Sequence, residues 1–254
     1  MALRDLCEDA ARAYERSRTH FAPGAGLVLD EAYCLAHLPL IDPEHPRAIP
    51  SKDGTYYRLG RHPRVFSIVL PFPGEALRQS QGYCEIEGEL RDSPFSAKIA
   101  WRLLDRRRDK LHATVCGSLS TNHPPLIDSA ARGQLATLGP VLVELRGLFS
   151  GNVNRGRLYL RVYPERRSGA NMFHQIQRAL GRPVTDLYVV GIWNLTDDLD
   201  AAEAAALSEM IERWWDRPIL QFEADNLLLL GASDDLVLDS SVIDRLPLTS
   251  TPSE

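Results

Sequence analysis

The segment VELRGLFSGNVNRGRLYLRVYP (143–164) constrains the fold of this chain more than any other. Two runs of leucine, valine and aromatic residues flank the turn SGNVNRG, and such runs joined by a Gly/Asn-rich turn predict a β-hairpin. Further strands are expected at three places, 64–72, 111–119 and 186–195. Helical patterns surround them, at 93–110, in the first half of 126–143, at 170–181 and at 197–216. Hairpins interleaved with helices favour an α+β fold with a mainly antiparallel sheet.

The remaining segments give weaker signals. Apolar residues at helical spacing predict a helix over 3–18. Prolines interrupt 22–63, so we expect an irregular extension there, with short strands around 26–40, that packs over the main domain. The run GYCEIEGEL (82–90) looks extended. Two closing strands are expected before a frayed tail, at 219–233 and 234–248.

The two halves of the chain resemble each other. RVFSIVLPF, a helix and LHATVCG follow the same order as GRLYLRVYP, a helix and LYVVGIW. Two such lobes, with helices on their outer faces, would form a pseudo-symmetric domain around a central cleft. The expected organisation is an N-terminal helix and irregular extension (1–63), a two-lobed domain (64–248) and a flexible tail (249–254).

Composition narrows the class of protein. The chain has 254 residues, 44% of them hydrophobic, which is enough to bury a substantial core. Its four cysteines lie far apart without a C-x-x-C pair, which argues against zinc ribbons and favours a reducing compartment. The sequence shows neither a signal-peptide core nor a run of about 18 apolar residues, so we expect a cytoplasmic location and no membrane contact. A net charge of −5 argues against charge-driven nucleic-acid binding but permits a local site for one phosphate.

Within the strand expected at 111–119, His112 and Thr114 project from the same face because successive side chains alternate. A histidine can transfer a proton near neutral pH, and a threonine hydroxyl can hydrogen-bond a phosphoryl oxygen. The same pattern also fits two polar residues on an ordinary strand. The seven histidines form no recognisable metal set, and those next to prolines, His45, His62 and His123, are predicted to lie on the surface.

The order of these segments over 64–248 resembles the two-histidine phosphoesterase superfamily, the 2′-5′ RNA ligase-like and cyclic phosphodiesterase-like proteins. The resemblance implies two H-x-[ST] motifs facing each other across a cleft, with one histidine as general base and the other as general acid. It implies no cofactor and no metal. The first motif maps onto His112 and Thr114. The second should fall in DLYVVGIWN and is absent, since one register places Leu187 and Val189 there and the other Tyr188 and Val190.

The strand RGRLYLRVYP places alternate polar side chains on one face, Arg157, Tyr159, Arg161 and Tyr163. This face either lines the cleft, where guanidinium groups would bind phosphate and rings would stack on a base, or faces solvent. The candidate substrate contacts are Tyr159, Arg161 and Tyr188. Two functions stay open: a divergent phosphodiesterase acting on a cyclic phosphate, nucleotide or RNA end, or an inactive module that binds RNA, a nucleotide or a protein partner in the same cleft. The oligomeric state stays open too.

Overall fold

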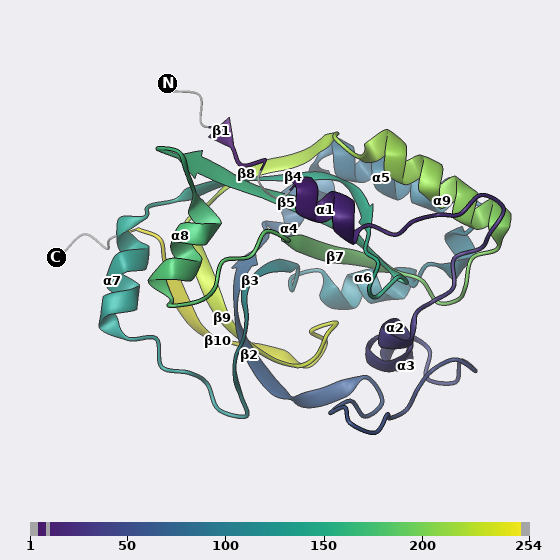
Figure 1. The fold of residues 1–254 in the computed structure, drawn as a ribbon, viewed down its shortest axis with the longest axis horizontal. Coiled ribbons are helices and arrows are strands. Elements are labelled where there is room, and N and C mark those ends of the chain that lie inside the picture. The colour runs from purple at the N-terminus through teal and green to yellow at the C-terminus, as the bar shows by residue number, and fades with distance from the viewer. Residues whose placement is uncertain (1–4, 9–10, 250–254) are drawn as a thin grey trace.

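The computed structural model describes residues 5–8 and 11–249, which form two antiparallel sheets with helices around them (Figure 1). The α+β class predicted from the sequence is confirmed. The larger sheet contains β4 (Val141–Ser150), β5 (Arg157–Arg167), β7 (Val189–Asn194) and β8 (Pro218–Ala224), with short strands β1 (Asp5–Leu6) and β6 (Ala170–Asn171) at one end of β5. The smaller sheet, in the order β10-β9-β2-β3, contains β10 (Ser240–Pro247), β9 (Asn226–Asp234), β2 (Arg61–Pro71) and β3 (His112–Thr121).

Helices cover the outer sides of both sheets. The larger sheet contacts α5 (Gln81–Asp92), α6 (Trp101–Arg107) and α9 (Ala201–Trp214), and α4 (Gly74–Gln79) also contacts β8. The smaller sheet contacts α7 (Ser129–Thr137). The helix α8 (Met172–Ala179) contacts β3 of the smaller sheet and β5 and β6 of the larger one. In Figure 1, α1 (Ala11–Ser17) lies over the larger sheet. The helices α2 (Glu31–Ala36) and α3 (Leu38–Ile41) lie together near the start of β2. None of the helices in the described part of the chain combines the length and apolarity of a bilayer-spanning segment.

Strand β5 separates the main core from a second, inner face of the larger sheet. Leu158, Leu160 and Val162 are completely buried in the main hydrophobic core. The alternate side chains Tyr159 and Tyr163 pack in a separate aromatic cluster with Tyr14 of α1. The N-terminal extension therefore covers the inner face of the larger sheet.

Two segments predicted to be extended are helices. The run 82–90 lies within α5, which begins where the Ser80 hydroxyl accepts a hydrogen bond from the Tyr83 N–H. Tyr83, Ile86 and Leu90 follow at helical spacing and are buried, although the alternating letters of this run imitate a strand. The strands expected around 26–40 are instead α2 and α3, since the Asp30 side chain caps α2.

Other boundaries also differ from the predictions. Ser93 ends α5 instead of starting a helix, so the helix expected over 93–110 is reduced to a 3₁₀ turn (Ser96–Lys98) and α6. The closing region forms three strands, β8, β9 and β10, instead of two. The helix expected over 3–18 is a short strand and α1 within the described residues; positions 1–4, 9–10 and the tail 250–254 lie outside them. The predicted hairpin, β2, β3, β7, α7, α8 and α9 are confirmed.

Candidate functional site

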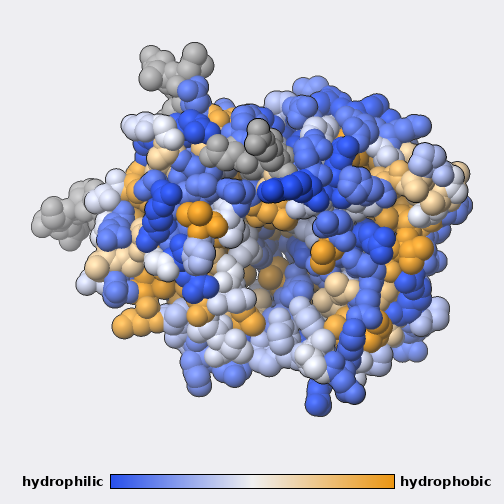
Figure 2. Space-filling view, in the orientation of Figure 1, coloured by the Kyte–Doolittle hydropathy of each residue, from blue (hydrophilic) through white to orange (hydrophobic). Residues whose placement is uncertain are grey.

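His112 and Thr114 line a cavity of about 310 Å³ between the smaller sheet and the N-terminal extension. They lie on β3 opposite Pro71 and Val69 of β2. Other side chains of the smaller sheet complete this wall, among them Ser67. The face of the molecule shown in Figure 2 is hollowed near its centre, close to where β3 lies in Figure 1.

The His112 ring presents a free nitrogen. Its Nδ1 lies 2.8 Å from the carbonyl oxygen of Lys110, so the neutral ring carries its proton on Nδ1 and leaves a lone pair on Nε2. Burial lowers the pKa of His112 to about 4; the Lys110 carbonyl acts against this shift, and the charges of Arg107 and Arg157 reinforce it. At neutral pH His112 is therefore an uncharged proton acceptor.

Arg157 brings a guanidinium group from the larger sheet to the lining of this cavity. Its Nη1 donates a hydrogen bond to the Asp235 carbonyl at 3.0 Å. The side chain crosses β7 at Gly191, where a Cβ would overlap it. The second motif was expected in β7. In the structure, the Arg157 side chain from the neighbouring strand β5 lies across β7 there.

Two more histidines line the cavity, His37 at the end of α2 and His62 at the start of β2. The Nε2 atom of His62 lies 3.2 Å from a carboxylate oxygen of Asp235, and its Nδ1 lies 2.8 Å from the Pro63 carbonyl. The Tyr57 hydroxyl donates to the other Asp235 oxygen at 2.8 Å, and the Nε2 of His37 lies 3.9 Å from that oxygen. Asp235 is thus the centre of a partly buried polar cluster.

The prediction that His62 lies on the surface is wrong, because its side chain is only 6% exposed. It adjoins a proline, as do His45 and His123, but the proline belongs to β2, not to a loop. Only His123 is exposed as predicted; the His45 side chain is 11% exposed and lies against Asp197. The sequence offered no signal for His37, which lies outside the region 64–248 that was predicted to be two-lobed.

Charge interactions tune the cluster. Burial acts to raise the pKa of Asp235, but His62, His37 and Tyr57 outweigh it and bring that pKa down to about 2. Burial acts to lower the pKa of His62, yet the Asp235 carboxylate and the Pro63 carbonyl raise it above its ordinary value. Burial lowers the pKa of His37 to about 3. The cavity therefore contains one histidine that favours its charged form and two that favour the neutral form.

Several polar atoms around the cavity are buried without a hydrogen-bond partner among the described residues. They are both ring nitrogens of His37, the Nε of Arg157 and the Oδ1 of Asn154. An unpaired buried polar atom is costly, by about 1–3 kcal/mol. A polar occupant of the cavity would satisfy them.

Strand register shows which face of β7 is turned to the inner side of the larger sheet. Val189 lies opposite Arg161 and Gly191 opposite Tyr159, and directly opposed residues share a face. The register with Leu187 and Val189 is therefore the inner one. It contains neither a histidine nor a hydroxyl group.

The other predicted substrate contacts lie elsewhere. Tyr188 is buried, with its hydroxyl bonded to Gln177 at 3.1 Å and to the Thr185 carbonyl. Arg161 is 1% exposed and donates a hydrogen bond to the Tyr163 hydroxyl at 2.7 Å. Its guanidinium group stacks on the indole ring of Trp215. Tyr159 packs in the aromatic cluster under α1. Of the five site residues predicted, His112 and Thr114 line the cavity.

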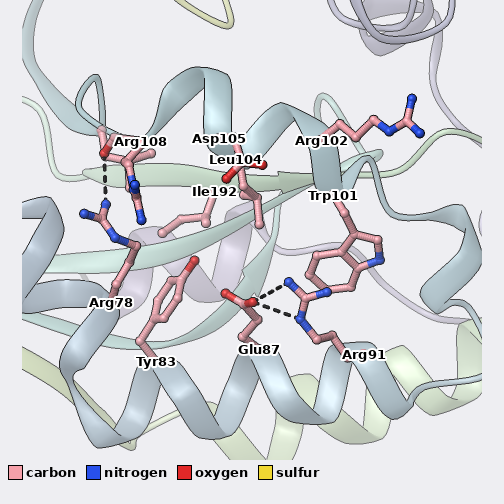
Figure 3. A pocket seen from close by; sticks show the side chains of 11 residues that line it. Arg78, Tyr83, Glu87, Arg91, Trp101, Arg102, Leu104, Asp105, Arg108 and Ile192 are labelled. Carbon is pink, nitrogen blue, oxygen red and sulfur yellow. Dashed lines mark hydrogen bonds and ion pairs between the residues drawn. The ribbon is translucent and has the colours of Figure 1, made fainter.

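A second cavity, of about 420 Å³, lies between α5 and α6 (Figure 3). Two of its arginines have partners within it: Arg91 pairs with Glu87 at 2.6 Å, and Arg78 donates to the Arg108 carbonyl at 3.4 Å. None of the described residues that line it is a histidine. The cavity around His112 is therefore the better candidate for proton-transfer chemistry.

Among the described residues, no group of three or more His, Cys, Asp or Glu side chains is arranged to hold a metal ion. The histidines, the Asp235 carboxylate and the arginine of the candidate site instead provide proton acceptors, a proton donor and a fixed positive charge. Fold and site together define an α+β protein of two antiparallel sheets with a polar, histidine-lined cavity.

This chain matches no family model and no curated protein. It is similar to some solved structures of known proteins. It is similar to TT0787 of Thermus thermophilus, at 14% identity and a TM-score of 0.40, over 74% of this chain and 100% of that one. It is also similar to E. coli LigT in its apo form, at 15% identity and a TM-score of 0.39, over 74% and 99% of the two chains. A structure of LigT complexed with NADP⁺ matches at 13% identity, a TM-score of 0.37, and 74% and 98% coverage.

Proposed function

We propose that this chain is a phosphodiesterase that opens a nucleoside cyclic phosphate, or a cyclic phosphate at an RNA end, in the cavity around His112. The observation that carries the proposal is that His112, Thr114 and Arg157 line the same cavity. A proton acceptor, a hydroxyl donor and a guanidinium group each support phosphoester hydrolysis. The cysteines lie far apart in the sequence, which fits the reducing cytoplasm that we propose as its location.

The proposed reaction uses the free Nε2 of His112 as general base. Nε2 takes a proton from a water molecule while the water oxygen bonds to phosphorus. One ester P–O bond breaks, and the leaving oxygen takes up a proton. Thr114 donates its hydroxyl hydrogen to a non-bridging oxygen, and Arg157 neutralises charge that develops there.

A second candidate is a binding protein without catalysis. Two observations favour it: β7 carries no second H-x-[ST] motif, and Tyr14 of α1 packs over the inner face of that sheet. The unpaired polar atoms of His37, Arg157 and Asn154 would then serve ligand binding alone.

Hydrolysis of adenosine 2′,3′-cyclic phosphate separates the two candidates. The enzyme hypothesis expects turnover by the wild type and a loss of about 10²–10⁴-fold in His112→Ala, the usual range for a positioned base. His123→Ala is the matched control, because His123 is exposed and does not line the cavity. No turnover by wild type, together with a raised unfolding temperature in the presence of the nucleotide, would instead support the binding protein.

A further inference from the structure

The reaction proposed above needs a proton donor as well as a base. A free alkoxide is a poor leaving group, so the oxygen that departs from phosphorus must be protonated as the bond breaks. His112 cannot serve, since it accepts the proton of the attacking water in the same step. The expected second motif is absent from β7.

We propose that His62, from the start of β2, is the general acid of this cavity and that Asp235 is its positioning residue. The inference rests on the proposed function. His62 lies before residue 64, outside the region that resembles two-histidine phosphoesterases. The proposal gives His62 the role that the missing motif leaves open. His62 and His112 come from neighbouring strands of the smaller sheet and line the same cavity.

The contacts of the His62 ring require two N–H groups. Nδ1 faces the Pro63 carbonyl at 2.8 Å and Nε2 faces the Asp235 carboxylate at 3.2 Å. A carbonyl and a carboxylate only accept hydrogen bonds, so a neutral ring would leave one nitrogen lone pair directed at an acceptor. The geometry therefore favours the imidazolium, whose Nε2 proton lies between the ring and Asp235, a residue that also lines the cavity.

The groups around His62 support the same charge state. Two carboxylates act on it, that of Asp235 directly and that of Asp234 at longer range. The rings of Tyr56 and Tyr57 lie edge-on to it, with centroid distances of 5.7 and 5.6 Å. The remaining titratable or charged groups on the cavity wall are His37, His112 and Arg157.

His37 does not suit this role. It stacks on Tyr33 with a centroid distance of 5.1 Å and is fully buried. Neither of its nitrogens has a hydrogen-bond acceptor among the described residues, and its closest carboxylate oxygen is 3.9 Å away. A ring in this environment stays neutral, so it holds no proton to give at neutral pH.

The protons balance over one turnover. As the P–O bond breaks, the Nε2 proton of His62 passes to the leaving oxygen, and the proton from the attacking water resides on Nε2 of His112. His62 then keeps its proton on Nδ1, which donates a hydrogen bond to the Pro63 carbonyl. Its bare Nε2 faces Asp235, which favours reprotonation from solvent, and His112 returns its proton to solvent.

Leaving-group dependence tests the assignment. Wild type and His62→Gln are compared on adenosine 2′,3′-cyclic phosphate, whose leaving group is an alkoxide, and on bis(p-nitrophenyl) phosphate, whose leaving group needs no protonation. A general acid matters only for the first substrate. We expect the loss of kcat/KM in His62→Gln to be about 10²-fold larger for the cyclic nucleotide than for the nitrophenyl ester.

The matched control is His45→Gln. His45 also adjoins a proline and lies 3.4 Å from a carboxylate, that of Asp197, but it does not line the cavity. We expect both activities to match wild type in this variant. Equal losses on the two substrates in His62→Gln would overturn the assignment and leave the proposed function standing. Wild type that hydrolyses neither substrate would overturn both.

A second variant guards against a folding defect in His62→Gln. Asp235→Asn keeps the size of the side chain and removes the charge that holds the imidazolium. We expect the alkaline limb of the pH–rate profile of kcat/KM for the cyclic nucleotide to move to lower pH by about one unit or more. A profile that keeps the wild-type alkaline limb would contradict the role of Asp235 and of His62.

Discussion

Arg157 reaches the cavity by lying across Gly191, since a Cβ at position 191 would overlap the Nε and Cζ atoms of the arginine. Both residues belong to the larger sheet, on the paired strands β5 and β7. The φ angle of Gly191 is not among the positive ones, so any residue could adopt its backbone conformation. What matters at this position is the absence of a side chain.

We therefore expect Gly191→Ala to displace the Arg157 guanidinium from the cavity. Overlap of this kind costs about 1–3 kcal/mol of the free energy of unfolding, which a urea titration measures. A displaced phosphate contact worth about 1.4 kcal/mol would also raise KM for the cyclic nucleotide about tenfold.

The control for this change is Gly88→Ala in α5, where an added Cβ meets no atom within 4 Å. Alanine in a helix interior should stabilise the protein by about 0.5–1 kcal/mol and leave KM unchanged. An unaltered KM in Gly191→Ala would show that Arg157 does not contact the substrate.

Thr114→Val is expected to weaken substrate binding while it preserves the shape of the cavity. Valine replaces the hydroxyl by a methyl group of similar size, so only the hydrogen bond to a phosphoryl oxygen is lost. A bond to a charged group is worth about 1.5–3 kcal/mol, which corresponds to a decrease of kcat/KM of about 10- to 100-fold. Thr121→Val, at the exposed end of the same strand, should leave kcat/KM at the wild-type value.

The parts of the fold that the sequence predicted well are those with strong local signals. The β4–β5 hairpin follows from its Gly/Asn-rich turn, and α9 from the helical pattern over 197–216. In the structure α9 begins at a capping box in which Asp200 and Glu203 bond reciprocally to the backbone. The α5 helix was missed because Tyr83, Ile86 and Leu90 sit in a run whose letters also alternate. Such a run is assigned by its neighbours in space, not by its own pattern.

The only part of the candidate site that the sequence predicted is the pair of residues on one strand, β3. His112 and Thr114 are two residues apart, so strand alternation alone places them together. The Asp235 cluster depends on tertiary structure, since Tyr57 and Asp235 are 178 residues apart in the sequence. The proline beside His62 suggested a surface loop. No local pattern indicated that the His62 side chain would be buried next to the Asp235 carboxylate.

The hydroxyl of Tyr14 fixes α1 to the larger sheet. It lies 2.9 Å from the Val162 carbonyl and 2.6 Å from the Tyr188 carbonyl, at the end of the β5–β7 pairing. We expect Tyr14→Phe to lower the free energy of unfolding by about 1–3 kcal/mol, because buried carbonyl groups lose a donor. Tyr56→Phe, at an exposed ring, is the matched control for stability. Equal unfolding midpoints for the two variants would contradict this role.

Stability should decrease as the pH falls from about 6.5 to 4. Burial lowers the pKa of His37 to about 3 and that of His112 to about 4, from an ordinary value of 6.5. In this window the unfolded chain binds protons that the native chain does not, so acid favours unfolding, by at most about 1.4 kcal/mol per pH unit for each histidine. The low pKa of Asp235 contributes only below its ordinary value of 3.8. Urea titrations at pH 7, 6, 5 and 4.5 measure the slope. His37→Gln should reduce it by about half, because glutamine binds no proton in either state, and a slope equal to that of wild type would show that His37 takes up its proton in the native cavity.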